Sequence, residues 1–144
     1  MLTYRLSNLI YNLGMEKLSL CIDKLYCLIF RNYIPGSCDL GKGTKLAYSG
    51  IGVVIHTKAK VGKCCVIGQN TTIGGRSKSV SAPIIGDNVY IGAGSRILGD
   101  ITIGDNVVIG ANAVVIESLP SRCVAVGIPA KVIKHNISSP RDYF

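Results

Sequence analysis

The chain has 144 residues, 48% of them hydrophobic and 17% charged, so it is long enough for one domain with a core and does not have the composition of a disordered protein. Seventeen glycines, 6% aromatic residues and no tryptophan indicate many tight turns and small inward side chains. The net charge of +8 favours contact with polyanions, but the basic residues are scattered and no nucleic-acid motif is present, so we expect no nucleic-acid partner.

Residues 1–34 carry apolar side chains at close to helical spacing, with Gly14 as a break, and so predict two short helices. The apolar run from Leu18 to Phe30 is interrupted by Asp23 and Lys24, and the N-terminus has no secretory pattern. We therefore expect no export and no membrane span, although weak contact of a basic helix face with a membrane surface stays open.

From residue 55 onwards, a branched aliphatic residue recurs at every sixth position. One position in this register fails, Ser79, and it lies in a polar stretch that predicts a loop. The matching residues are Ile55, Val61, Ile67, Ile73, Ile85, Ile91, Ile97, Ile103, Ile109 and Val115. A period of six fits neither a helix nor a lone strand and predicts a solenoid of short strands joined by corners, whose stacked coils bury the aliphatic residues.

A mostly smaller residue lies two positions before each aliphatic residue, and a glycine usually follows it. The predicted helices would cover the open end of this solenoid, which otherwise exposes apolar surface and unpaired strand edges. The interval from Ile73 to Ile85 leaves two placements for the loop at residues 74–83: it replaces one side of a coil, or it bulges out with about six extra residues.

The segment Gly127–Lys134 ends the repeats, because Pro129 has no N–H for a ladder hydrogen bond. We expect residues 135–144 to form a loosely held tail. The predicted organisation is a helical cap at residues 1–34, a solenoid at 35–134 and a C-terminal tail at 135–144. The six cysteines form no CxxC pair, which predicts neither a zinc site nor a disulfide framework and favours a cytoplasmic location.

The repeat resembles that of the hexapeptide acyltransferases, and the resemblance implies an all-β solenoid, a left-handed parallel β-helix. Residues 35–134 look like the serine acetyltransferase branch, and especially like its short relatives that O-acetylate sugars in polysaccharide biosynthesis. The segments that carry this resemblance are Leu46–His56, Thr71–Gly75, Ile91–Gly99, Ile109–Ala113 and Gly127–Lys131. The resemblance implies a homotrimeric acyltransferase that moves acetyl from acetyl-CoA to a hydroxyl group of a sugar or polysaccharide precursor.

Serine acetyltransferases are similar but have a much longer helical N-terminal domain, and they carry two histidines that this sequence does not match. Tyr48 or Ser49 stands at the first histidine position and Ala82 at the second. Direct acetyl transfer needs a base for the acceptor hydroxyl, and histidine suits that role. We predict His56 as the base, because it stands in a register slot usually held by glycine and should point outward, whereas His135 follows the last repeat. A surface or structural histidine is the alternative. Tyr48 and Ser49 are predicted to orient the acceptor, and a packing role is the alternative for Tyr48.

The resemblance also implies a donor groove beside small residues, with basic side chains for the cofactor phosphates. The predicted donor residues are Gly74, Gly75, Arg76, Lys78, Ala93, Gly94, Ser95, Ala111, Ala113, Lys131 and Lys134. The alternatives are that the small residues only suit the tight coil and that each basic residue is a solvated charge. No metal is predicted, because a β-helix carbonic anhydrase needs three histidine ligands and the chain has two.

Three alternatives remain: a serine O-acetyltransferase, an N-acetyltransferase acting on an amino sugar, and a non-catalytic trimeric scaffold. The absent family histidines favour the scaffold, whereas the small-residue segments and His56 count against it. Acetyl-CoA binding separates the scaffold from the enzymes, since a scaffold has no reason to keep a donor groove.

Overall fold

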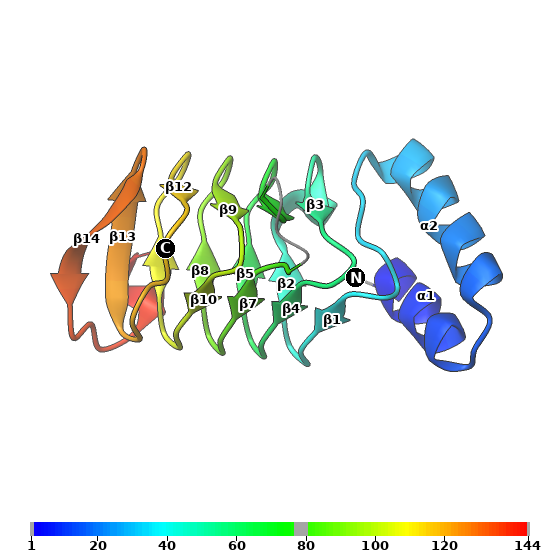
Figure 1. Cartoon of the computed structure of the whole chain (residues 1–144), viewed down its shortest axis with the longest axis horizontal. Coiled ribbons are helices and arrows are strands. Elements are labelled where there is room, and N and C mark those ends of the chain that lie inside the picture. The colour runs from blue at the N-terminus through cyan, green and yellow to red at the C-terminus, as the bar shows by residue number, and fades with distance from the viewer. Residues whose placement is uncertain (1, 77–80, 144) are drawn as a thin grey trace.

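The computed structural model describes residues 2–76 and 81–143 and shows a helical cap on one end of a parallel β-solenoid (Figure 1). The cap contains helices α1 (Leu2–Asn12) and α2 (Glu16–Phe30), which pack against each other. They are joined at Gly14, whose φ of +79° lies in the region that favours glycine. The prediction of two helices broken at Gly14 is confirmed.

The solenoid has three faces, each a sheet in which strands from successive coils pair in parallel. The first face contains β1 (Asp39–Leu40), β4 (Lys60–Val61), β7 (Ile84–Ile85) and β10 (Thr102–Ile103). The second contains β2 (Lys45–Leu46), β5 (Val66–Ile67), β8 (Tyr90–Ile91), β11 (Val108–Ile109), β13 (Cys123–Gly127) and the antiparallel β14 (Ala130–His135). The third contains β3 (Val54–Ile55), β6 (Thr72–Gly74), β9 (Arg96–Leu98) and β12 (Val114–Val115). This is the predicted left-handed parallel β-helix.

The six-residue repeat places its aliphatic residues inside the prism. None of the ten residues in that register is more than 3% exposed, and their smaller partners two positions earlier are buried with them. Burial of each aliphatic side chain is worth about 1.5–3 kcal/mol. One column of the smaller residues runs through the third face, because strand pairing aligns Val53, Thr71, Ser95 and Ala113 in successive coils.

The glycines have different roles at the three corners. We call the turn from the first to the second face the first corner, the turn from the second to the third face the second corner, and the turn back to the first face the third corner. A Cβ on Gly62 at the first corner would overlap the Gly86 carbonyl, and one on Gly92 at the second corner would lie 2.5 Å from the Ala111 nitrogen. At the third corner, a Cβ on Gly74 would meet nothing closer than 3.5 Å. Side chains are therefore tolerated at the third corner and not at these positions of the other two.

Short polar side chains hold the first corner together along the solenoid axis. Asp87 accepts the Lys63 N–H at 2.7 Å, and Asp105 accepts the Asp87 N–H at 2.7 Å. Ser121 continues this ladder by accepting the Asp105 N–H at 2.9 Å. These contacts give both aspartates the structural role expected of turn residues.

The chain between β6 and β7 has extra residues at the third corner, and residues 77–80 of the predicted loop lie outside the described residues. Strand β4 pairs directly with β7, and β6 with β9, so no side of a coil is missing. Paired residues Ile85 and Val61 are 24 positions apart, whereas Ile103 and Ile85 are 18 apart. The loop therefore carries six extra residues, which decides between the two predicted placements.

The cap is joined to the first coil by hydrogen bonds of buried side chains. Tyr4 Oη donates to the Cys38 carbonyl at 2.9 Å and accepts the Leu40 N–H at 3.1 Å. The Asp23 carboxylate accepts from Ser7 Oγ at 2.6 Å and from the Gly36 N–H at 3.1 Å. The cap therefore supplies partners for main-chain groups that the first coil would otherwise leave unpaired at its open end.

The prediction of a loosely held tail is wrong for the described residues up to Tyr143. Ile137 is 3% exposed and packs with Val108 and Val124 over the outer side of the second face. Its carbonyl accepts from the Arg122 guanidinium at 3.3 Å. The apolar outer residues of the second face explain this packing, because the tail covers surface that would otherwise be wet.

Candidate active site

His56 lies at the third corner, directly after β3, and is half-buried. The outward position predicted from its register slot is confirmed. Its Nδ1 accepts the Lys58 N–H at 3.1 Å, and its Nε2 edge faces Gly75. Because a neutral imidazole has one donor and one acceptor nitrogen, this bond puts the proton on Nε2. In this geometry the ring is a hydrogen-bond donor on its free side, and a base role requires the Lys58 bond to break first.

Tyr48 and Ser49 lie at the second corner, in the short 3₁₀ segment Ala47–Gly50. Their φ angles are +48° and +59°, a region that non-glycine residues enter at a cost of about 1–3 kcal/mol. Tyr48 is 74% exposed, so burial does not repay this strain. Strained, exposed side chains of this kind cluster at functional sites, which keeps both residues as candidates for the acceptor site.

The structure does not bring Tyr48 and Ser49 together with His56. The two corners flank the third face, and the chain between Gly52 and His56 spans about 13 Å as extended strand. Within one chain, the predicted base and the predicted acceptor residues therefore form two half-sites.

The predicted donor residues divide between the same two corners. Gly74 ends β6, and Gly75 and Arg76 follow it at the third corner, where Arg76 packs over Gly99. Lys78 lies outside the described residues. At the second corner, Ala111 is exposed, and Ala93 and Gly94 are half-buried.

Ser95 and Ala113 were predicted to let the donor approach the main chain closely, and their side chains themselves point away from any such groove. Both are fully buried and lie in the inner column of the third face, so their small size serves the core. The main chain beside them is also engaged, because the Arg96 guanidinium donates to the carbonyls of Gly94 and Ser95 at 2.9 and 3.1 Å. Arg96 was not predicted as a site residue, although its place in the repeat, one position before the buried Ile97, already indicates that its side chain points outward on β9.

Lys131 and Lys134 lie on β14 at the far end of the solenoid. Lys131 Nζ is 3.9 Å from the Glu117 carboxylate in an exposed ion pair. Lys134 lies over the Tyr143 ring at 5.3 Å, and its hydrogen bond to that residue raises the pKa of Lys134. Both ammonium groups already have partners, so a phosphate would have to compete with Glu117 for Lys131 and with Tyr143 for Lys134.

A hollow opens between the cap and the first coil, beside the third corner. It measures about 450 Å³, and its lining residues are Tyr11, Ser37, Asp39, Thr57, Lys58, Ala59 and Lys60. An adjoining recess of about 180 Å³ shares Tyr11, Ser37 and Thr57 and adds Tyr33 and Asp23 among others. Burial, followed by the nearby Asp23 carboxylate, raises the pKa of Tyr33, so its hydroxyl stays protonated at neutral pH. We call the two volumes together the cap hollow.

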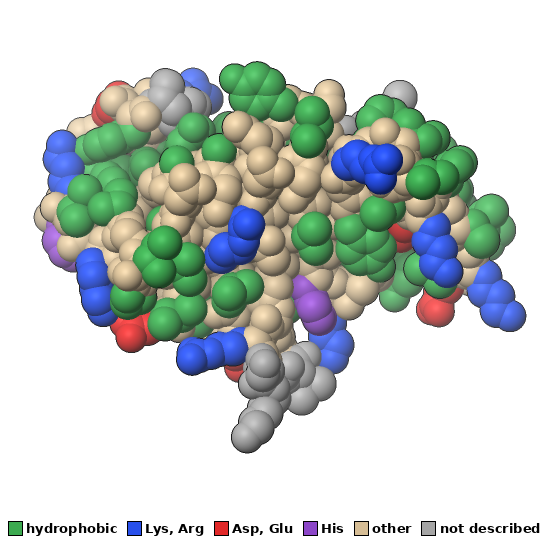
Figure 2. All heavy atoms as spheres, turned by 90° about the horizontal axis from the view of Figure 1, so that it is seen from above, with side chains coloured by type: hydrophobic (Ala, Val, Ile, Leu, Met, Phe, Trp, Pro, Cys, Tyr) green, Lys and Arg blue, Asp and Glu red, His purple; other side chains and the backbone are tan. Residues whose placement is uncertain are grey.

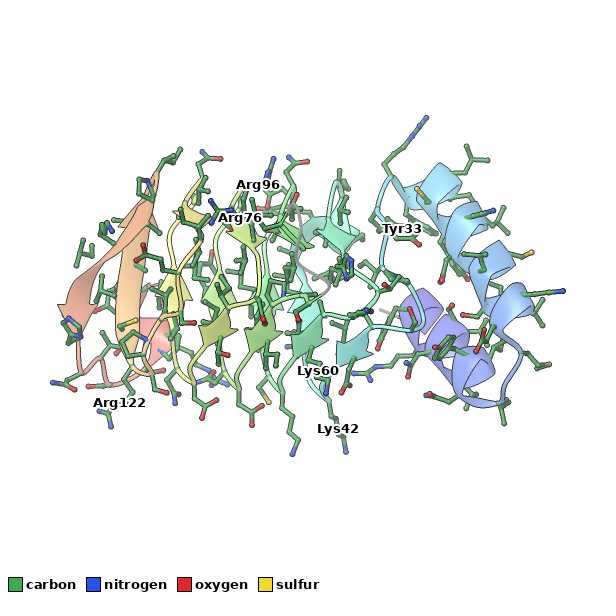
Figure 3. The ribbon with its side chains drawn as sticks, in the orientation of Figure 1. Tyr33, Lys42, Lys60, Arg76, Arg96 and Arg122 are labelled. Carbon is green, nitrogen blue, oxygen red and sulfur yellow. The ribbon has the colours of Figure 1, made fainter. Side chains whose placement is uncertain are left out.

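The cap hollow could not be predicted from the sequence, because segments distant in sequence form its walls. Figure 3 shows Tyr33 between the solenoid and α2. In the same view Lys42 and Lys60 extend from one edge of the solenoid, and Arg76 and Arg96 lie at the opposite edge. Among residues 2–76 and 81–143, no group of three or more His, Cys, Asp or Glu residues is placed to hold a metal ion. No helix in the same ranges is long and apolar enough to cross a membrane.

Two family models match the repeats: "Bacterial transferase hexapeptide (six repeats)" at residues 82–117 and "Hexapeptide repeat of succinyl-transferase" at residues 64–97. These matches fall on the coils from β5 to β12, whose stacked aliphatic residues and corner glycines define the repeat. Residues 64–117 of the β-solenoid are therefore similar to the repeats of hexapeptide transferases.

The chain is similar to serine acetyltransferases in particular. It is 37% identical over 132 residues to the serine acetyltransferase of Synechococcus elongatus, covering 90% of this chain and 54% of that protein. The Brucella abortus serine acetyltransferase in complex with coenzyme A superimposes with a TM-score of 0.88 at 32% identity, over 92% of this chain and 54% of the other. The soybean serine acetyltransferase complexed with serine superimposes with a TM-score of 0.86 at 34% identity, over 91% of this chain and 54% of the other.

The chain therefore spans about half the length of the relatives it matches. These relatives are serine acetyltransferases, and they do not support the predicted closeness to sugar O-acetyltransferases.

Proposed function

We propose that this chain is an acetyl-CoA-dependent O-acetyltransferase, with serine as its first candidate acceptor. The observation that carries the proposal is the likeness, over nine-tenths of the chain, to a serine acetyltransferase solved with coenzyme A. In direct transfer, the acceptor oxygen attacks the thioester carbonyl carbon, and the C–S bond breaks to release the thiolate of coenzyme A. The acceptor hydroxyl gives its proton to a base, which returns it to the leaving sulfur.

His56 is the base in this proposal, and the structure adds a condition to that role. Its Nδ1 must first lose the Lys58 N–H, by rotation of the ring, so that an unprotonated nitrogen can face the acceptor. Without that rotation, the Nε2–H beside Gly75 is placed to donate a hydrogen bond to an oxyanion instead. The two roles predict different behaviour of His56→Gln, which keeps a donor and lacks a base.

We further infer a homotrimer whose active sites lie between subunits. In support, one chain has two half-sites on separate corners, and a three-fold arrangement of prisms can set the second corner of one subunit against the third corner of the next. Tyr48 and Ser49 would then face the partner's histidine across the interface.

Subunit mixing tests the shared site. Tyr48→Ala and His56→Ala should each abolish transfer alone, whereas trimers assembled from an equal mixture should regain activity at about a quarter of the sites, where both residues are intact. A mixture as inactive as its parents, with mixed trimers demonstrated by mass spectrometry, would contradict the shared site.

A sugar hydroxyl is the second candidate acceptor. The observation that favours it is the replacement of both family histidines, since Tyr48 is exposed and strained and Ala82 is 5% exposed at these positions. Thiol release from acetyl-CoA, measured with serine and with a panel of sugars and nucleotide sugars, decides between the two. Acetyl-CoA binding with no release for any acceptor would remove the enzyme proposal, and absence of binding as well would favour the scaffold.

The outer surface of the cap supports a proposal of weak contact with an anionic membrane surface. Exposed apolar side chains gather on both helices, and Figure 2 shows hydrophobic side chains with basic ones among them at this end. They include Leu9 on α1, Leu13 just after it, and Leu25 and Leu28 on α2, which are between 55% and 68% exposed. Lys17 and Lys24 supply the complementary charge.

We also propose a cytoplasmic location, supported by six cysteines that are all free.

A further inference from the structure

We propose that helix α2 inserts its outer face into the surface of an anionic lipid bilayer. This inference rests on the weak membrane contact proposed above and deepens it, because it assigns the contact to one helix face and makes the insertion of apolar side chains the main source of binding. It begins from the packing of α2, which is the reverse of that of an ordinary amphipathic helix, whose apolar side faces the core.

The side of α2 that faces the rest of the protein is polar. Every residue of this helix is described, and only Ser19 and Asp23 are buried, with 2% and 7% of their surface exposed. Ser7 of α1 contacts both: its Oγ lies 2.8 Å from Ser19 Oγ and donates to the Asp23 carboxylate at 2.6 Å. Within the described part of the chain, no side chain of α2 belongs to the hydrophobic core that Tyr4 of α1 joins. Polar contacts therefore hold α2 in place.

The opposite side of α2 is apolar and exposed. Leu18, Leu25 and Ile29 follow one another at intervals of seven and four residues, so they share one helix face, and they are between 47% and 58% exposed. Leu28 lies beside them and is 68% exposed. Of the seventeen large apolar side chains that are exposed in the described structure, ten belong to the cap, so this exposure is concentrated at one end. A contiguous apolar surface of this kind indicates a partner that covers it.

The charges beside this face favour an anionic bilayer over a second copy of the chain. Lys17, Lys24 and Arg31 are exposed, and none of them forms an ion pair in the described part of the chain. Within residues 2–34, Glu16 is the only exposed acid. Two caps that met face to face would bring like charges together, whereas anionic lipid headgroups supply the opposite charge.

The length of α2 suits insertion among the headgroups. Its 15 residues measure about 22 Å, and no described helix is long and apolar enough to cross a membrane. A helix lying in the plane of the interface buries its apolar side chains at the acyl boundary while its lysines reach the headgroups. Figure 1 shows α2 at the end of the molecule opposite β14, where a flat surface can reach it.

A single tryptophan tests insertion, because the chain has none of its own. Leu28→Trp places this probe on the outer face of α2. Ile133→Trp is the matched control, since Ile133 is 64% exposed on β14 at the other end of the molecule. With vesicles of phosphatidylcholine and phosphatidylglycerol, the emission of Leu28→Trp should shift to the blue and become protected from iodide quenching, and that of Ile133→Trp should not change.

Vesicle sedimentation measures the lipid preference. Each basic residue near an anionic surface strengthens binding on the order of fivefold, so the wild type should bind the mixed vesicles about tenfold or more strongly than phosphatidylcholine alone. Lys17→Gln with Lys24→Gln should reduce this preference, and Lys45→Gln, on β2 of the second face, should leave it unchanged. Leu25→Gln with Leu28→Gln should weaken binding to both vesicles about tenfold or more, in a helix whose propensity glutamine preserves.

The absence of a blue shift overturns the inference, and vesicle binding without that shift leaves only the weak charge contact. Equal binding to both vesicles, or binding that survives the paired leucine substitutions, also overturns it. If the wild type forms a larger assembly than the paired leucine variant in the absence of lipid, by analytical ultracentrifugation, a second copy covers the face and the inference fails. Should the leucine variant lose stability, the tryptophan probe and the lysine pair still decide the matter.

The outcome is separable from that of the proposed activity, because these measurements use neither acetyl-CoA nor an acceptor. If thiol is released from acetyl-CoA and no vesicle is bound, the acetyltransferase proposal stands and the membrane inference fails. If α2 inserts into anionic vesicles but no acceptor releases thiol, the membrane inference stands and the acetyl transfer fails.

Discussion

Replacing Ser95 with alanine should stabilise the protein, although Ser95 was a predicted donor residue. Its hydroxyl is fully buried inside the third face and, among the described side chains, is a buried polar group without a hydrogen-bond partner. The next coil already has alanine in this column, at Ala113, so the backbone accepts the smaller side chain.

The size of the effect follows from the unpaired oxygen. A buried hydroxyl left without a partner costs about 1–3 kcal/mol, and the dispersion contacts of one oxygen return only ~0.1–0.2 kcal/mol each. We expect a net gain of about 1–2 kcal/mol in the free energy of unfolding. For a chain of this length, this corresponds to a rise in Tm of ~3 °C or more, measured by calorimetry at fixed protein concentration.

Thr71→Val is the matched control in the same column. Thr71 Oγ1 donates to the Gly92 carbonyl at 3.5 Å, so this variant removes a hydrogen bond and should lose about 0.5–1.5 kcal/mol. Val53 in the preceding coil shows that valine fits the column. A lower Tm for Ser95→Ala, or a raised KM for acetyl-CoA with an unchanged Tm, would refute the assignment of Ser95 to the core.

Three further predictions concern other parts of the molecule. Gly92→Ala should lose at least about 3 kcal/mol of stability in denaturant titration, because the new Cβ lies 2.5 Å from the Ala111 nitrogen, whereas Gly74→Ala should stay within about 1 kcal/mol; similar losses would contradict the distinction between corners. His56→Ala should reduce kcat by about 10²–10⁴-fold, and His56→Gln should be equally impaired if His56 is a base, whereas near-normal activity of His56→Gln would assign it as a donor. Burial raises the pKa of the Cys38 thiol from 9.0 to about 12, so its contribution to stability is complete below pH 9 and is lost as the pH rises towards 12. Cys38→Ala should flatten this alkaline decline in the free energy of unfolding, and an unchanged slope would contradict the raised pKa.

Much of the fold could be predicted because the sequence pattern of a solenoid recurs in every coil. Each coil has aliphatic residues at the same positions, so one exception such as Ser79 does not obscure the register. The C-terminal tail has no repeat, and its packing depends on one residue, Ile137, meeting apolar outer positions of the second face. Outer positions carry no fixed pattern, because either solvent or another segment can cover them.

The candidate site was less predictable, because a linear register does not say which way a small residue faces. Ser95 and Ala113 stand two positions before core aliphatics, and that spacing, properly weighed, already places them inside. The separation of Tyr48 from His56 follows from the same register, since a strand of the third face lies between them. The cap hollow was beyond reach, because its walls come from α1, from the segment before β1 and from the third corner.

The packing of the coils explains why the third corner has room for candidate functional groups. At the first corner, successive coils are so close that a Cβ on Gly62 would overlap the main chain of the next coil, and at the second corner Gly92 is similarly confined. The third corner leaves ordinary van der Waals space around Gly74 and Gly75, and there the chain carries His56, a loop with six extra residues and the rim of the cap hollow. A tightly stacked solenoid adds side chains and insertions where its coils leave room. Besides the third corner, this is the second corner of the first coil, where Leu46 and Ile55 are nine positions apart whereas their partners Ile67 and Ile73 are six apart.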